Sequence, residues 1–168
     1  MVLNKYNMKY LIFFILFQII EKGALYEEYR KAADKNIDVI LGKGELKFIP
    51  VESKHEYYSF LAEKSNEKSY VAFSSAMGRM DYFDYMVITD ELLTISDIKI
   101  LKYRSEYGYE ISNKGWLKQF YNKPGASFQY KKNIDALSGA SFSAQSLVND
   151  LNSILEELKT ITMSEVKN

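Results

Sequence analysis

The sequence predicts an α+β fold, in which an antiparallel β-sheet packs with helices in a single domain after an apolar N-terminal leader. The chain has 168 residues, a length that fits one domain. Three β-prone runs follow one another between residues 69 and 103 with brief turns between them, which is typical of an antiparallel meander. Helical periodicity before and after these runs indicates helices packed against the sheet.

Residues 1–24 have the build of a signal peptide or membrane anchor. Lys5 and Lys9 precede an apolar run at residues 10–20. This run is shorter than the roughly 20 apolar residues of a standard membrane span, and small residues at the spacing of a cleavage site do not follow it. We expect export, with the leader cleaved or retained, and keep a buried N-terminal helix or strand as the alternative.

The domain itself is predicted for residues 25–168. Apolar positions at three- and four-residue steps predict a helix over residues 25–41, which ends at Gly42. Residues 45–51 alternate enough for a strand. Residues 55–68 look polar and irregular, with one apolar patch.

The rest of the chain completes the predicted order α-β-β-β-β-α-β-α. The elements expected there are strands at residues 69–76, 80–89 and 93–103, a short helix at 114–120, a last strand at 127–134, and a helix from residue 142 onward. That last helix follows from apolar residues at helical spacing: Leu147, Val148, Leu151, Ile154, Leu155 and Leu158.

The composition excludes several classes of function. The 22 basic and 22 acidic residues balance, so no basic excess favours a nucleic-acid partner. The chain has no cysteine, which excludes disulfides, Cys-ligated zinc, iron–sulfur clusters and a thiol nucleophile. The single histidine, His55, excludes a multi-His metal site, and we expect it to be a plain surface residue. Asp81 and Asp84 are expected at turn and solvent positions.

The stretch 135–143 is the strongest candidate site. Gly139 lies in a turn that leads into the last predicted helix, and Ser141 and Ser143 bring two hydroxyls to the same place. Unpaired N–H groups and the helix dipole at such a start suit a phosphate. A serine-capped helix with no ligand is the alternative.

The loop at residues 104–110 is a second candidate. It gathers Arg104, Glu106, Gly108 and Glu110 after a predicted strand. A glycine there would suit a backbone that approaches a ligand closely, although a loop without a function is also possible.

The segment Asp135-Ala136-Leu137-Ser138-Gly139-Ala140-Ser141 resembles the Asp-x-x-Ser-Gly-Ala-Thr signature of the FMN-binding domain. This domain occurs in the G subunit of Rnf-type electron transport complexes, in the C subunit of the sodium-pumping NADH:quinone reductase and in small exported flavoproteins. Residues 83–88, 101–111 and 116–120 also resemble stand-alone members, so the resemblance covers roughly residues 68–158.

The resemblance implies covalently bound FMN. In this family a flavin transferase, served by a divalent metal, moves FMN from FAD onto the hydroxyl of the last signature residue through a phosphoester bond. That residue corresponds to Ser141, a serine where the family usually has threonine, and Ser143 is the backup acceptor. The other cofactor-binding residues implied are Ser138, Gly139 and Ala140 at the phosphate, Asp135 as a recognition or turn-bracing residue, Glu106 and Gly108 beside the ring, and Tyr107 or Trp116 as a stacking or shielding group.

The function expected from the resemblance is electron relay outside the cytoplasm. An exported protein, periplasmic or membrane-anchored, would take electrons from a membrane donor and pass them to an unknown redox acceptor. A binding or scaffold domain of the same fold without flavin is the runner-up, because Ser141 departs from the family. A flavin reductase acting directly on a small acceptor is a third possibility. The chain lacks a nicotinamide-type Gly-rich fingerprint, which argues against direct use of NAD(P)H.

Overall fold

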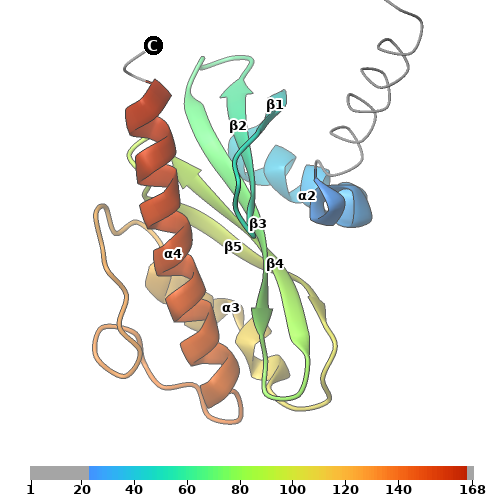
Figure 1. Ribbon diagram of the computed structural model, residues 1–168, viewed down its shortest axis with the longest axis vertical. Helices are drawn as coiled ribbons and strands as arrows, with labels where there is room; N and C mark the ends of the chain where they lie inside the picture. Colours follow the sequence, from blue (N-terminus) through green and yellow to red (C-terminus); the bar gives the residue numbers. More distant parts are fainter. Residues whose placement is uncertain (1–22, 166–168) are drawn as a thin grey trace, which may run out of the picture.

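A computed structural model describes residues 23–165 as a five-stranded antiparallel sheet with helices on both faces (Figure 1). The strands lie in sequence order across the sheet, β1-β2-β3-β4-β5, so the α+β prediction is confirmed. The elements are α2 (Ala24–Leu41), β1 (Gly44–Ile49), β2 (Glu56–Ala62), β3 (Lys68–Met77), β4 (Tyr82–Asp90), β5 (Ile95–Tyr103), α3 (Lys114–Leu117) and α4 (Ser141–Glu165), with short 3-10 helices at Tyr109–Ser112 and Lys118–Phe120.

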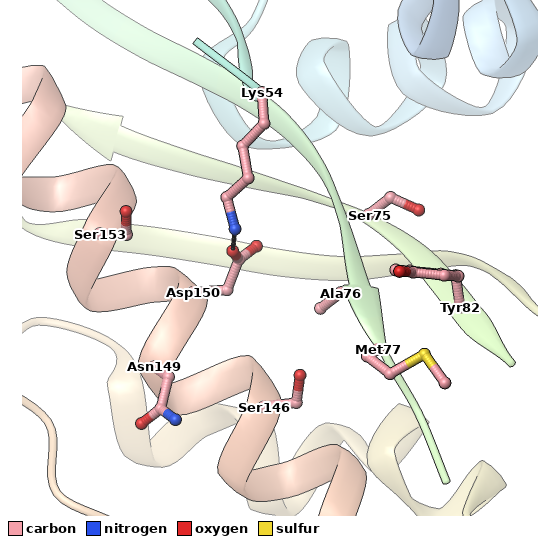
Figure 2. A pocket seen from close by; sticks show the side chains of 9 residues that line it. All are labelled: Lys54, Ser75, Ala76, Met77, Tyr82, Ser146, Asn149, Asp150 and Ser153. Carbon is pink, nitrogen blue, oxygen red and sulfur yellow. Dashed lines mark hydrogen bonds and ion pairs between the residues drawn. The ribbon is translucent and has the colours of Figure 1, made fainter. Parts of the chain in front are cut away.

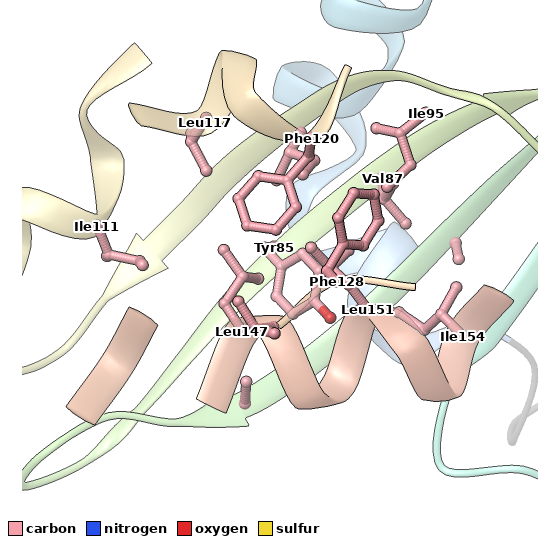
Figure 3. Packing of buried hydrophobic residues seen from close by; sticks show 14 of the residues in the cluster. Tyr85, Val87, Ile95, Ile111, Leu117, Phe120, Phe128, Leu147, Leu151 and Ile154 are labelled. Atoms are coloured by element: carbon pink, nitrogen blue, oxygen red, sulfur yellow. The ribbon is translucent and has the colours of Figure 1, made fainter. Parts of the chain in front are cut away.

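The sheet separates two apolar cores. On one face, α2 covers Tyr58, Phe73 and Met86. On the other face, α3 and α4 cover a larger core, in which the helical residues Leu147 and Leu151 are fully buried (Figure 3). Of the apolar residues at helical spacing further along α4, Ile154 and Leu158 are also fully buried, and Leu155 is half-buried.

Strand β2 corrects the prediction that residues 55–68 are irregular. Its register with β3 runs from Glu56 opposite Phe73 to Leu61 opposite Lys68. Tyr57 packs into the α4-side core, whereas Tyr58 and Phe60 pack into the α2-side core. A strand that is buried on both faces shows no alternation of polar and apolar residues, and this is why the pattern was missed.

The strand predicted at residues 127–134 is also wrong. This segment is a loop with one isolated bridge between Tyr130 and Ile134. The side chain of Asn152 accepts a hydrogen bond from the Phe128 N–H at 2.9 Å and donates one to the Phe128 carbonyl at 2.8 Å. Phe128 is therefore buried without a neighbouring strand because an α4 side chain satisfies its backbone, whereas the backbone of buried Ile134 bonds Gln129 and Lys131 within the loop.

The leader predicted for residues 1–24 falls almost wholly outside the described residues. Of the helices described between residues 23 and 165, none combines the length and the apolar character needed to span a bilayer.

Candidate functional site

A cavity of about 340 Å³ opens at the start of α4. Three segments form it: the turn between β3 and β4, the loop after β5, and the first turn of α4 with the residues before it. The residues that line it are Arg79, Gly108, Gly139, Ala140, Ser141, Phe142 and Ser143. The structure therefore brings Gly108 together with most of the 135–143 stretch, although 31 residues separate Gly108 from Gly139 in the sequence.

Among residues 23–165, no side chain accepts a hydrogen bond from the first N–H groups of the helix inside this cavity. Ala140, directly before α4, has no polar side-chain atom, and the first hydrogen bond of the helix runs from the Ala144 N–H to the Ala140 carbonyl at 2.8 Å. The Ser141 hydroxyl donates instead to the Leu137 carbonyl, at 3.4 Å. The N–H groups of the first turn thus have no partner within the helix and carry the positive end of its dipole.

The two candidate hydroxyls differ in access. Ser141 is exposed, whereas Ser143 is only 1% exposed. The Tyr103 hydroxyl donates to the Tyr107 carbonyl at 2.7 Å, so the Ser143 Oγ at 2.9 Å donates to the Tyr103 oxygen. The arrangement favours Ser141 over Ser143 as an acceptor, because the Ser143 hydroxyl is buried and already bonded.

Two glycines allow the segments that line the cavity to approach other side chains closely. Gly108 has φ +94°, and a Cβ there would lie 2.4 Å from the Tyr103 hydroxyl oxygen. Gly139 has φ +82°, and a Cβ there would lie 2.6 Å from Oε1 of Glu110. Both positions need a left-handed backbone and a close approach, which only glycine supplies without strain. The close approach expected at Gly108 is thus made by a tyrosine of this chain.

Asp135 braces the turn through its backbone. Its N–H donates to the side chain of Gln119 at 2.9 Å, and its carbonyl accepts a hydrogen bond from the Trp116 indole, also at 2.9 Å. Trp116 is itself 6% exposed and packs edge-on against Phe120. Trp116 therefore supports the turn from the core and does not line the cavity.

The remaining predicted residues lie at the surface or near it. Glu106, Tyr107 and Ser138 are exposed, and none of the three lines the cavity. Tyr107 presents its ring to solvent while its carbonyl anchors Tyr103.

Arg79 is the functional candidate that the sequence did not reveal. It belongs to the turn between β3 and β4, where a glycine-arginine pair indicates only a turn, and it lines the cavity together with the helix start. Among the described residues it forms no ion pair, so its guanidinium is available to an anion.

His55 is wrongly predicted as a surface residue, because its side chain is fully buried. Its Nε2 lies 3.2 Å from Oδ1 of Asp150, and its Nδ1 lies 3.0 Å from Oε2 of Glu157. Burial alone would lower the pKa of His55, but the hydrogen bonds to these two carboxylates raise it above its usual value. The imidazolium form is thereby favoured, with one carboxylate at each ring nitrogen.

Asp150 joins α4 to three parts of the sheet layer. It accepts hydrogen bonds from Ser74 at 2.5 Å and from Tyr85 at 2.7 Å, and it forms an ion pair with Lys54. Burial would raise its pKa, but the hydrogen bonds from His55 and these groups hold the pKa well below its usual range. We call His55, Asp150, Glu157 and Lys54 the histidine cluster.

Asp84 is also buried, at 1% exposure, where a solvent position was expected. It forms an ion pair with Arg104 and accepts a hydrogen bond from Tyr29 of α2 at 2.6 Å and from Ser75 at 2.5 Å. Arg104 of the predicted ligand loop therefore serves the contact between α2 and the sheet. Asp81, by contrast, is exposed as expected.

No protein-family model matches this sequence, and no curated protein matches it either. The resemblance to the FMN-binding domain therefore rests on the motifs quoted above.

Proposed function

We propose that this protein is an electron-transfer flavoprotein that holds FMN at the start of α4, attached through its phosphate to Ser141. One observation carries the proposal. The exposed Ser141 hydroxyl lies in a cavity that is lined both by the helix start, whose first N–H groups are unpaired within the helix, and by Arg79.

The phosphate would be held by charge and by backbone donors. The first-turn N–H groups and the positive end of the α4 dipole favour an anion, and Arg79 adds a full positive charge. The Glu110 carboxylate occupies the space beside Gly139, so the phosphate would be held by the first-turn N–H groups and Arg79 and not on that side of Gly139. These features supply what a phosphate monoester needs from a protein.

The attachment step uses the Ser141 oxygen as the nucleophile and is performed by a flavin transferase. The Ser141 Oγ forms a bond to the FMN-side phosphorus of FAD, and the diphosphate P–O bond breaks. AMP leaves, and the hydroxyl proton goes with it. Ser141 suits this step better than Ser143, because an acceptor oxygen has to reach the transferase site.

FMN supplies one- and two-electron redox chemistry when bound, and attachment through the phosphate leaves its ring unaltered. The role of this chain is to orient the ring and set its surroundings. Phe142, 57% exposed and next to Ser141, is the aromatic residue that lines the cavity, and Tyr107 presents a second exposed ring on the neighbouring loop. Trp116 keeps the turn at Asp135 in place from below.

The partners and the location follow from the resemblance and from the apolar leader. We propose an exported protein, periplasmic or anchored by residues 1–24, that relays electrons from a membrane donor to a redox acceptor outside the cytoplasm. A covalent bond suits that location because free FMN is lost there by dilution.

Co-expression with a flavin transferase tests the proposal. The intact mass of the wild-type protein should rise by one FMN less one water, with a yellow product whose colour is bleached reversibly by a chemical reductant. Ser141→Ala should remove the mass increment. Ser143→Ala should keep it, since that hydroxyl only bonds Tyr103. Expression without the transferase is the control.

Two results would overturn the proposal. An unmodified mass in every preparation, with correct folding by circular dichroism, would favour a scaffold domain without flavin. A mass increment that survives in Ser141→Ala and disappears in Ser143→Ala would move the attachment to the buried serine.

A further inference from the structure

Strand β3 extends beyond its neighbour β2 and leaves one edge open. The pairing with β2 stops at Glu56 opposite Phe73, whereas the pairing with β4 continues to Met77 opposite Tyr82. Within the described part of the chain, residues 74–77 therefore have a strand on one side only (Figure 1).

The alternation of hydrogen bonds shows which groups face the open side. Gly78 donates its N–H to the Asp81 carbonyl of the β4 side at 2.8 Å. In an antiparallel ladder, residues that bond one neighbour alternate with residues that face the other. Ser75 and Met77 consequently direct their N–H and C=O groups away from β4, toward the open edge.

The chain before β2 does not fill this edge. Residues 51–55 turn away toward α4, and their backbone groups bond locally. Ser53 donates its N–H to the Val51 carbonyl at 3.1 Å, and His55 donates its N–H to the Ser53 hydroxyl at 3.1 Å. The histidine cluster anchors this loop on α4, which holds it away from β3.

A cleft of about 390 Å³ lies along the open edge (Figure 2). One wall is β3, and the other is a row of polar side chains on α4. The lining residues are Ser75, Ala76 and Met77 of β3, Tyr82 of β4, Ser146, Asn149, Asp150 and Ser153 of α4, and Lys54 at one end. Lys54 and Asp150 neutralise each other, so the cleft has no net charge from this pair.

We propose that this cleft binds an extended segment of a partner protein, which adds to the sheet as a strand beside β3. The open groups of Ser75 and Met77 are two donors and two acceptors in strand register, and another backbone in extended conformation matches them. The hydroxyl and amide groups of Ser146, Asn149 and Ser153 suit uncharged polar side chains on that segment. An uncharged, extended peptide is therefore the occupant that fits.

The cleft opens beside the cavity at Ser141 but does not depend on it. Met77 precedes Arg79 by two residues, and Ser146 follows Ser143 by less than one helical turn. A partner strand bound here would bring the partner next to the candidate cofactor site, and Ser141 is not among the residues that line the cleft. The proposal stands on the open edge alone, so it survives if Ser141 is never modified.

Hydrogen exchange on the free full-length protein is the first test. The amides of Ser75 and Met77 should exchange fast, while those of Ser74 and Ala76, paired with β4, should exchange slowly. Slow exchange at Ser75 and Met77 in the free protein would overturn the proposal, because it would mean that another part of the chain or a second copy already covers the edge.

Peptide binding is the second test. The probe is an array of acetylated, amidated hexapeptides whose positions alternate between Val, Ile or Tyr and Ser, Thr or Asn. Selected binders should slow the exchange of Ser75 and Met77. Met77→Pro removes one edge donor without touching the β4 ladder and should weaken binding by roughly tenfold, the effect of one lost hydrogen bond.

Met77→Ala is the matched control and should keep the affinity within about twofold, since its backbone donor remains. Both variants should retain the wild-type circular dichroism spectrum. Failure of every peptide in the array to bind, or equal loss of affinity in Met77→Pro and Met77→Ala, would overturn the proposal.

Discussion

Replacement of Asp150 by asparagine tests a buried carboxylate that bonds four side chains. The Asp150 carboxylate is 6% exposed and is bonded by His55, Lys54, Ser74 and Tyr85. An asparagine side chain would fill the same volume but would bring an amide N–H₂ against groups that are all donors. Asp150→Asn therefore removes the negative charge and also places the amide N–H₂ donor against a donor of a neighbouring side chain.

The stability lost in Asp150→Asn depends on the burial of the carboxylate. Loss of one partner from a buried ion pair costs about 3–5 kcal/mol. We expect a value near the lower limit, about 3 kcal/mol, because Glu157 still pairs with His55 and the amide oxygen keeps some of the bonds. Lys54 adds little, since its side chain is 63% exposed. For a chain of this length the melting temperature should fall by roughly 6–12 °C.

The pH dependence has a defined sign. The lowered pKa of Asp150 contributes stability that is present above its unfolded value of 3.8 and is lost as the pH falls through the folded pKa. The raised pKa of His55 contributes stability that is present below 6.5 and is lost as the pH rises through the folded pKa. The difference in free energy of unfolding between wild type and Asp150→Asn should therefore be largest from about pH 4 to pH 6.5 and should become smaller below and above this range.

Urea unfolding, followed by circular dichroism at several pH values, measures this difference. The midpoint should fall at a constant m-value. Asp38→Asn, on the exposed surface of α2, is the matched control and should leave the midpoint unchanged. A loss below about 1 kcal/mol for Asp150→Asn, or a difference that does not change with pH, would refute the interpretation of the histidine cluster as a charged, buried contact.

Two further substitutions test the sheet and the cavity wall. Arg104→Gln removes the cation that pairs with buried Asp84. The pKa of Asp84, which is below its usual value in the wild type, should therefore rise, and acid unfolding should begin at a higher pH. A pH series of urea midpoints measures this, and an unchanged onset of acid unfolding would contradict the pairing. Gly108→Ala should lower the free energy of unfolding by about 1–3 kcal/mol more than Gly125→Ala does. Both glycines have positive φ, but only a Cβ at residue 108 would meet Tyr103. Equal losses of unfolding free energy would contradict this close approach.

The sequence predicted most of the fold because the signals involved are local. The helix at residues 25–41 and the three strands predicted between residues 69 and 103 follow from patterns within each segment, and the structure confirms them as α2, β3, β4 and β5. The segments 55–68 and 127–134 were mispredicted because distant partners decide them. The strand β2 is buried between two cores, and the loop at Phe128 is held by Asn152, 24 residues away.

In the candidate site, too, local patterns were predicted from the sequence and contacts between distant residues were not. The sequence indicated the stretch 135–143 and Gly108 because turn glycines and hydroxyls before a helix form a local pattern, and the structure places Gly108 and residues 139–143 at one cavity. His55 was misjudged because its partners Asp150 and Glu157 lie 95 and 102 residues away. Arg79 was missed because only the fold brings the turn between β3 and β4 against the start of α4.

Peptide mapping of the protein after co-expression with a flavin transferase tests the proposed role of Ser141 most directly. Trypsin cleaves after Lys132 and Lys159, so residues 133–159 form one peptide that contains every serine of the candidate site. We predict an FMN phosphoester on this peptide, which fragmentation assigns to Ser141. An unmodified peptide, or FMN on Ser138 or Ser143 instead, would contradict the proposed attachment.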